Sequence, residues 1–229
     1  MSSYLGSKAA SGLYQNIIAM MPPHETYIET HLGGGAIMKR KPPTINNIGI
    51  DIDSEALANF DSDYSVDLVN SCAHHFLTSY DYSGTELIYC DPPYLTQTRA
   101  SSRSRYRFEY TDQDHVTLLT LIKTLPCNVI LSGYPSSLYD ELLNDWNTIE
   151  LQAMTQGGPR TEKIWYNYTI DRVHWATYAG KDFIDRQRIK RKAERWGKKY
   201  QALPNAERLA ILAALMEVEA FDITPECNQ

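Results

Sequence analysis

The chain has 229 residues, of which 43% are hydrophobic and 22% are charged, and it carries a net charge of −6. This length suits one ordinary α/β domain with additional segments. No apolar run reaches the roughly 20 residues of a membrane-spanning helix, and no basic segment followed by an apolar core marks a signal peptide. These features exclude an integral membrane protein and predict a cytoplasmic one.

The first predicted elements are read from apolar runs and from the residues that end them. Leu13 to Met21 has helical spacing and stops at Pro22-Pro23. Thr26 to Glu29 predicts a strand that leads into the glycines 33–35, after which Ala36-Ile37-Met38 opens a helix. Residues 48–51 predict a second strand, and Ser54 is expected to cap a helix that runs to Phe60.

The second half continues the alternation of strands with helices. Thr111 and Asp114 have the spacing of a capping box and predict a helix after them. The remaining predicted elements are strands at 87–90, 128–131 and 163–168 and helices at 182–201 and 205–221, which Pro204 separates. The pattern predicts an α/β fold with a doubly wound, Rossmann-like parallel sheet in residues 1–180 and a helical C-terminal extension in residues 181–229.

The four cysteines, Cys72, Cys90, Cys127 and Cys227, are scattered along the chain. Neither a Cys-x-x-Cys pair nor a Cys/His spacing typical of a metal site occurs. The sequence therefore predicts free thiols in a reducing compartment and no metal.

The turn after the first strand has the features of a cofactor site. Gly33, Gly34 and Gly35 allow a ligand to approach the backbone closely. The pyrophosphate fingerprint G-x-G-x-x-G fails, because Met38 stands where the third glycine would be. This favours a ligand without a pyrophosphate, such as S-adenosylmethionine. Asp51, at the end of the next strand, is placed to accept the ribose hydroxyls, although it and Asp53 could also simply cap the following helix.

A second turn, Asp91-Pro92-Pro93-Tyr94, directly follows the apolar strand 87–90. The exocyclic nitrogen of adenine is a poor nucleophile because its lone pair is delocalised into the ring. A carboxylate and a backbone carbonyl that accept its two N–H groups would localise that lone pair for attack on a sulfonium methyl. The prolines stiffen the turn, and Tyr94 offers a face on which a base can stack. The alternative, a rigid turn without chemistry, accounts for less of the pattern.

Basic residues gather in two segments despite the acidic total. Residues 181–201 contain nine Lys or Arg and three acids, and a second cluster consists of Arg99, Arg103, Arg105 and Arg107. Such asymmetry indicates a polyanionic partner, although a solvated helix face gives the same pattern.

Over most of residues 1–180 the sequence resembles the compact, Dam-like adenine-specific DNA methyltransferases of bacteria and their phages. Blocks that resemble the family are Tyr4 to Lys8, Tyr27 to Ala36, Asp91 to Tyr94, and Leu131-Ser132-Gly133-Tyr134. The resemblance implies a class I methyltransferase fold, S-adenosylmethionine as cofactor and double-stranded DNA as partner. It also implies three sets of site residues: catalytic Asp91, Pro92, Pro93 and Tyr94; cofactor-binding Tyr4, Lys8, Glu29, Gly33, Gly34, Gly35, Asp51 and Asp91; and nucleic-acid-binding Arg99, Arg103, Arg105, Arg107 and Tyr134.

The sequence departs from the family in three places. Thr30-His31 replaces the common Pro-Phe after Glu29, and His75 precedes Phe76 where an acid is common. Only 55 residues separate Gly35 from Asp91, so no recognition domain is inserted there. Target reading is expected from the loop 95–110, the segment around Gly157 to Arg160, or the helical tail.

Other functions remain as alternatives. A methyltransferase acting on adenine in RNA or on the cytosine amine shares the chemistry, although such cytosine enzymes usually carry serine in place of Asp91. A non-catalytic nucleic-acid-binding protein and a nucleotide-dependent oxidoreductase fit less well, because the catalytic block is intact and the glycine fingerprint fails. The target sequence, a monomeric or dimeric state, and a role in restriction-modification are left open by the sequence.

Overall fold

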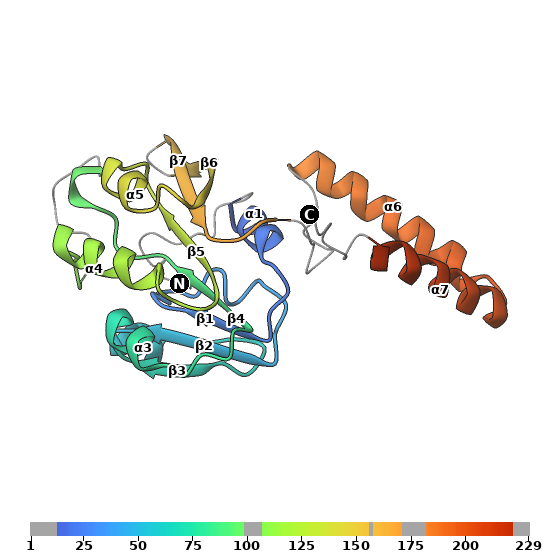
Figure 1. Ribbon diagram of the computed structural model, residues 1–229, viewed down its shortest axis with the longest axis horizontal. Helices are drawn as coiled ribbons and strands as arrows, with labels where there is room; N and C mark the ends of the chain where they lie inside the picture. The colour runs from blue at the N-terminus through green and yellow to red at the C-terminus, as the bar shows by residue number, and fades with distance from the viewer. Residues whose placement is uncertain (1–12, 99–106, 156–157, 171–181, 222–229) are drawn as a thin grey trace, which may run out of the picture. The chain divides into compact units, whose positions relative to one another are not determined.

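A computed structural model describes residues 13–98, 107–155, 158–170 and 182–221 (Figure 1). The chain divides into two compact units, Met1–Ala179 and Gly180–Gln229.

The first unit is built on a seven-stranded sheet with the strand order β3-β2-β1-β4-β5-β7-β6. Five neighbouring strands are parallel, whereas β7 runs antiparallel to both β5 and β6. The strands are β1 (Thr26–Glu29), β2 (Asn46–Asp51), β3 (Asp67–Asn70), β4 (Glu86–Cys90), β5 (Asn128–Gly133), β6 (Asn147–Thr155) and β7 (Gly158–Tyr166). The predicted doubly wound α/β sheet is confirmed, with a final antiparallel hairpin that the alternation of elements did not indicate.

Helices cover both faces of this sheet, because successive side chains of its central strands point to opposite sides and both sets are apolar. In β4, Leu87 and Tyr89 join one buried cluster, whereas Ile88 and Cys90 join the other. The first cluster includes residues of α1 (Leu13–Met20) and α2 (Ser54–Ala58). The second includes residues of α3 (Ala73–Ser79), α4 (Asp112–Ile122) and α5 (Ser137–Leu142). A short 3₁₀ helix, η1 (Thr96–Thr98), follows β4.

The predicted capping box is confirmed at the start of α4. The Thr111 side chain accepts a hydrogen bond from the Asp114 amide, and Asp114 accepts one from the Thr111 amide. The cap of α2 is different from the one expected. Asp53 is the N-cap residue and accepts from the Glu55 amide, so Ser54 is the first residue of the helix.

The helix expected to open at Ala36 does not form. Residues 36–40 make turns, with the Lys39 amide donating to the Gly35 carbonyl and the Lys41 amide to the Ile37 carbonyl. Pro42 explains the stop, because it lacks an N–H and disfavours helical geometry at the residue before it. Strand β3 was not predicted because Asp67–Asn70 lacks an apolar run. Strand β6 was also not predicted, although Ile149, Leu151 and Ala153 alternate with polar residues in its sequence.

The described residues of the second unit form two helices, α6 (Phe183–Gln201) and α7 (Asn205–Phe221), joined by a short turn (Figure 1). Both agree with the predicted ranges. The Asp182 side chain caps α6 by accepting from the Asp185 amide, and the Tyr200 hydroxyl donates to the Arg208 carbonyl across the turn. Among the residues described, no helix is long and apolar enough to cross a membrane.

Candidate active site

The residues predicted to carry the chemistry meet where the carboxyl ends of the parallel strands share one edge of the sheet. Asp51 ends β2, and Asp91 directly follows β4, with β1 between these two strands. The connections from β1 and β4 lead to opposite sides at this point, which is where ligands bind in open α/β sheets. A pocket opens there, lined by Thr30, His31, Gly33, Asp51, Ile52, Asp53, Cys72, Ala73, Asp91, Pro93, Arg107, Phe108 and Tyr110.

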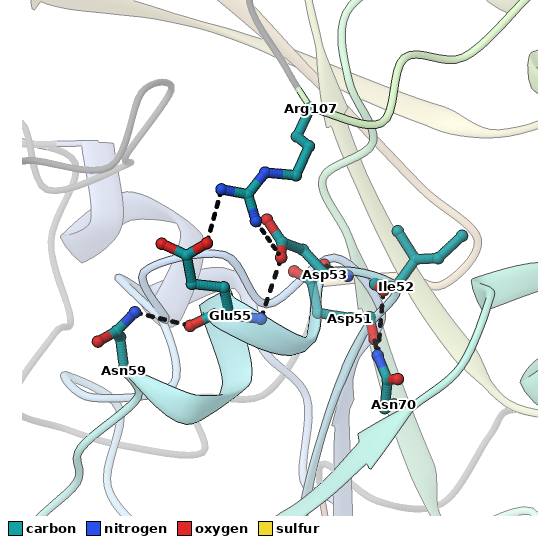
Figure 2. Close-up of polar contacts among 7 residues, drawn as sticks. All are labelled: Asp51, Ile52, Asp53, Glu55, Asn59, Asn70 and Arg107. Atoms are coloured by element: carbon teal, nitrogen blue, oxygen red, sulfur yellow. Dashed lines mark hydrogen bonds and ion pairs between the residues drawn. The ribbon is translucent and has the colours of Figure 1, made fainter.

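The glycine turn and Asp51 are locked together at one end of this pocket. The Gly33 amide donates to Asp51 Oδ2 at 2.7 Å, and the Asp53 amide donates to Oδ1 at 2.8 Å. From β3, the Asn70 side-chain amide donates to the carbonyls of Asp51 and Ile52 (Figure 2). Burial raises the pKa of Asp51, although both backbone donors oppose that shift. The carboxylate is therefore held in one orientation beside a residue without a side chain.

Asp91 lies at another part of the same pocket and is oriented by the neighbouring strand. Ser132 on β5 donates from Oγ to Asp91 Oδ1 at 3.0 Å. The Ser132 hydroxyl also lies 2.9 Å from the Tyr89 hydroxyl on β4. Ser132 is fully buried, so this chain of hydroxyls fixes the Asp91 carboxylate from inside the sheet.

Tyr94, the expected stacking residue of the catalytic turn, is buried. Its hydroxyl donates to Glu162 Oε1 on β7 at 2.9 Å. Its ring lies 4.2 Å from the ring of Tyr134, and the guanidinium of Arg160 lies over Tyr134 at 5.7 Å. Tyr134 thus covers one face of the Tyr94 ring. Asp91 and Pro93 are the residues of the catalytic turn that line the pocket. Stacking of a base on Tyr94 stays a prediction.

Glu29 faces the glycine turn rather than the lining of the pocket. Its Oε2 accepts from the Met38 amide at 2.9 Å and from the Tyr27 hydroxyl at 3.1 Å. Burial raises the pKa of Glu29 to about 8, against the opposing effect of the Tyr27 hydrogen bond. In this structure Glu29 fixes the path of the chain after Gly35, and direct contact with a cofactor stays a prediction.

Arg107 closes one side of the pocket through ion pairs with the helix that follows β2. Its guanidinium lies 3.0 Å from Asp53 Oδ1 and 2.7 Å from Glu55 Oε2 (Figure 2). The expected role of Arg107 is nucleic-acid binding, whereas here it is paired with two acids beside Asp51. Nucleic-acid binding by Arg107 stays a prediction. A phosphate would have to compete with the two carboxylates for the guanidinium.

Another part of the pocket lining is aromatic. The His31 Nε2 atom lies 2.9 Å from the Tyr110 hydroxyl, and the ring of His74 stacks on Tyr110 at 5.4 Å. Burial, together with the nearby His74 and His115, lowers the pKa of His31 to about 3. His31 is therefore neutral at physiological pH, and it adds no positive charge that would repel a sulfonium.

Several predicted residues lie outside the described parts of the chain: Tyr4, Lys8, Arg99, Arg103 and Arg105. Sequence reasoning in turn did not single out Ile52, Cys72 and Phe108, which line the pocket. Cys72 follows β3, and its position would have been found had that exposed edge strand been recognised. Ser132 was part of a family block, but no sequence signal linked it to Asp91.

These residues fit S-adenosylmethionine. The buried Asp51 carboxylate would accept ribose hydroxyls, and the glycine at position 33 leaves room beside it. Ile52 and Phe108 are 47% and 43% exposed in the same pocket, and the flat face of an aromatic ring such as adenine would cover them. Among the residues described, no group of three or more His, Cys, Asp or Glu is arranged to hold a metal ion.

The strand order with an antiparallel seventh strand, and acids at the ends of β2 and β4, define the class of S-adenosylmethionine-dependent methyltransferases with a Rossmann-like fold. Residues 51–156 match the model of the D12 class N6 adenine-specific DNA methyltransferase family. This match begins at Asp51 and contains Asp91 to Tyr94, and it confirms the family resemblance over that part of the chain.

Solved structures with similar folds have low sequence identity. TrmK of M. capricolum in complex with S-adenosylhomocysteine is 10% identical, with 90% of this chain and 95% of that chain covered and a TM-score of 0.44. An rRNA methylase of Streptococcus thermophilus is 12% identical, with 67% and 93% covered and a TM-score of 0.42. The N-methyltransferase NodS of Bradyrhizobium japonicum with S-adenosylhomocysteine is 9% identical, with 68% and 84% covered and a TM-score of 0.46. No curated protein matches the sequence.

Proposed function

We propose that the protein transfers a methyl group from S-adenosylmethionine to the exocyclic N6 of adenine in double-stranded DNA. The observation that supports this proposal is that two acids, Asp51 and Asp91, line the same pocket. Asp51 is held by the glycine turn, and Asp91 is held by Ser132. One acid suits a ribose and the other suits an amine, so a single pocket would serve both reactants.

Asp91 would act by accepting a hydrogen bond from the N6 amine. A second acceptor, the Pro92 carbonyl, would take the other N–H, because the prolines of the turn supply no competing N–H donors. Both bonds favour a tetrahedral nitrogen whose lone pair points at the methyl donor. The bound cofactor supplies an electrophilic methyl on a sulfonium. The N6 lone pair would take the methyl as the sulfonium–methyl bond breaks, with S-adenosylhomocysteine as the neutral leaving group, and the nitrogen would then lose one proton to solvent and be neutral again.

The Tyr89–Ser132–Asp91 chain supports this role, because preorganised acceptors contribute most when they need not reorient during reaction. An adenine inside a duplex is stacked and out of reach of this turn. The nucleotide would therefore have to flip out into the pocket, at a cost of a few kcal/mol in unstacking. The first unit would carry the catalysis, and the basic second unit would assist in binding DNA.

The test is methyl transfer from radiolabelled S-adenosylmethionine to unmethylated duplex DNA of mixed sequence, followed by digestion to nucleosides. Label in N6-methyl-2′-deoxyadenosine is expected. Asp91→Asn keeps the shape of the side chain but replaces the carboxylate with a weaker, neutral acceptor, so incorporation should fall while cofactor binding, measured by calorimetry, is retained. The matched control is Asp145→Asn, because Asp145 is an exposed acid paired with Lys123.

The alternatives give different products in the same assay. Label in RNA only, or in N4-methylcytosine, would replace the proposal with one of the related methyltransferase activities. Cofactor binding without incorporation into any nucleic acid would contradict the catalytic proposal. Normal turnover by Asp91→Asn would remove Asp91 from the mechanism.

A further inference from the structure

Helix α6 carries a concentration of positive charge that the active site does not use. Between Phe183 and Gln201 it has eight Lys or Arg residues and two acids, Asp185 and Glu194. Its net charge is thus +6, in a chain whose total is −6. Such a segment repels itself unless solvent or a polyanion neutralises it.

The positive charge is arranged on one face. At 3.6 residues per turn, six of these residues fall within an arc of about 120°, and both acids of the helix fall outside it. We call this set the α6 basic face: Arg188, Arg191, Lys192, Arg195, Lys198 and Lys199. All six are exposed. Within the described part of the chain, Arg188 is the one member with an ion pair, to Asp185 at 2.7 Å.

The half-buried apolar residues of α6 lie outside the arc of the basic face. They are Ile189 and Tyr200, and the Tyr200 hydroxyl donates to the Arg208 carbonyl at the start of α7. The six cations are more exposed than these two residues. The α6 basic face is therefore open to solvent, and a polyanion could reach it.

We propose that the α6 basic face binds the sugar-phosphate backbone of duplex DNA, an inference that rests on the proposed function. The six cations span roughly 16 Å of helix, and a duplex presents one phosphate charge about every 1.7 Å of its axis. The aromatic residue Trp196 lies outside the arc, so this face offers cations for phosphates rather than rings for bases. It adds affinity for DNA of any sequence and does not read the target.

A lipid surface is the other polyanion to consider. Helices that bind membranes combine a basic face with a broad apolar face that enters the lipid. In α6 the exposed large apolar residues are Phe183, Ile184 and Trp196. At 3.6 residues per turn they are spread around the helix and form no broad apolar face, so the pattern favours DNA. Anionic vesicles therefore serve as a competing ligand in the test.

The experiment compares two double variants of the full chain that remove the same charge. Lys192→Gln with Arg195→Gln alters the basic face, and Arg186→Gln with Lys190→Gln alters the helix outside it. Binding to a duplex without the target adenine is measured by fluorescence anisotropy from 50 to 300 mM salt. Removal of one cation that neutralises a phosphate should lower the slope of log Kd against log salt by about 0.9. The slope should therefore fall by up to about 2 in the first variant and by little in the second. Far-ultraviolet circular dichroism checks that both variants keep the helix.

Methyl transfer separates this proposal from the catalytic one. The first variant should raise the KM for DNA while kcat and the cofactor Kd stay unchanged. Equal salt slopes in the two variants, or binding to phosphatidylserine vesicles in preference to DNA, would overturn the assignment of the α6 basic face. Absence of methylation by the unaltered protein would contradict the proposed function but leave the salt slopes measurable.

Discussion

Gly35 occupies a position that the structure closes to any other residue. Its φ is +63°, in the left-handed region, and a Cβ built on it would overlap Phe60 Cε2 and lie 2.9 Å from Phe60 Cδ2. Phe60 packs against the first buried cluster, and the Lys39 ammonium lies 4.8 Å from its ring centre. The ring must therefore shift to admit even one methyl group.

The expected cost of Gly35→Ala has two parts. The left-handed conformation costs an L-residue about 1–2 kcal/mol. Overpacking against the ring adds about 1–3 kcal/mol. The free energy of unfolding should therefore fall by roughly 2–5 kcal/mol. The affinity for S-adenosylmethionine should fall as well, because the displaced turn carries the Gly33 amide that binds Asp51.

Gly84→Ala is the matched control in the same unit. Gly84 has φ +88°, but the nearest atom to its added Cβ, the Pro126 carbonyl oxygen, lies at an ordinary 3.8 Å. This variant should show only the conformational part of the cost, about 1–2 kcal/mol. Phe60→Ala in the Gly35→Ala background should remove most of the overpacking. Denaturation in urea, followed by tryptophan fluorescence, measures all four proteins. A decrease in stability for Gly35→Ala no larger than for Gly84→Ala would refute the reasoning.

Three further predictions concern the site. Burial raises the pKa of Glu29 from 4.5 to about 8, so its ionisation favours the unfolded chain, and stability falls as pH rises from about 4.5 to 8. Glu29→Gln should therefore raise the free energy of unfolding by on the order of a few kcal/mol at pH 8 and by little at pH 4, as measured by thermal melts. The control is Glu25→Gln, because Glu25 is exposed. Ser132→Ala should lower kcat by about 10-fold or more with the cofactor Kd unchanged, because the Asp91 carboxylate loses the Ser132 donor and Ser132 does not line the pocket; an unchanged kcat would contradict this. Arg107→Gln should raise the cofactor Kd and reduce its sensitivity to salt, because the ion pairs to Asp53 and Glu55 hold one wall of the pocket; equal salt dependence in both proteins would argue against it.

Elements with local signals could be predicted from the sequence. The short apolar runs of β1, β4 and β5, the capping box at Thr111 and the two C-terminal helices were predicted near their observed bounds. The sequence also placed Asp51 and Asp91 at strand ends that share one edge, because parallel strands in a doubly wound sheet bring their carboxyl ends together. These features depend on periodicity and on neighbouring residues, which a single sequence displays directly.

The partner that each side chain takes could be seen only in the folded chain. Arg107 pairs with Asp53 and Glu55 across more than 50 residues of chain, and Tyr94 bonds to Glu162 on β7. The exposed strand β3 forms because β2 offers it a free edge, since its own sequence has no apolar run. The helix expected after Gly35 does not form, because Pro42 follows the turns at residues 36–40 and Glu29 accepts a hydrogen bond from the Met38 amide within them. Such contacts arise when distant segments of the chain pack together, so local sequence patterns do not predict them.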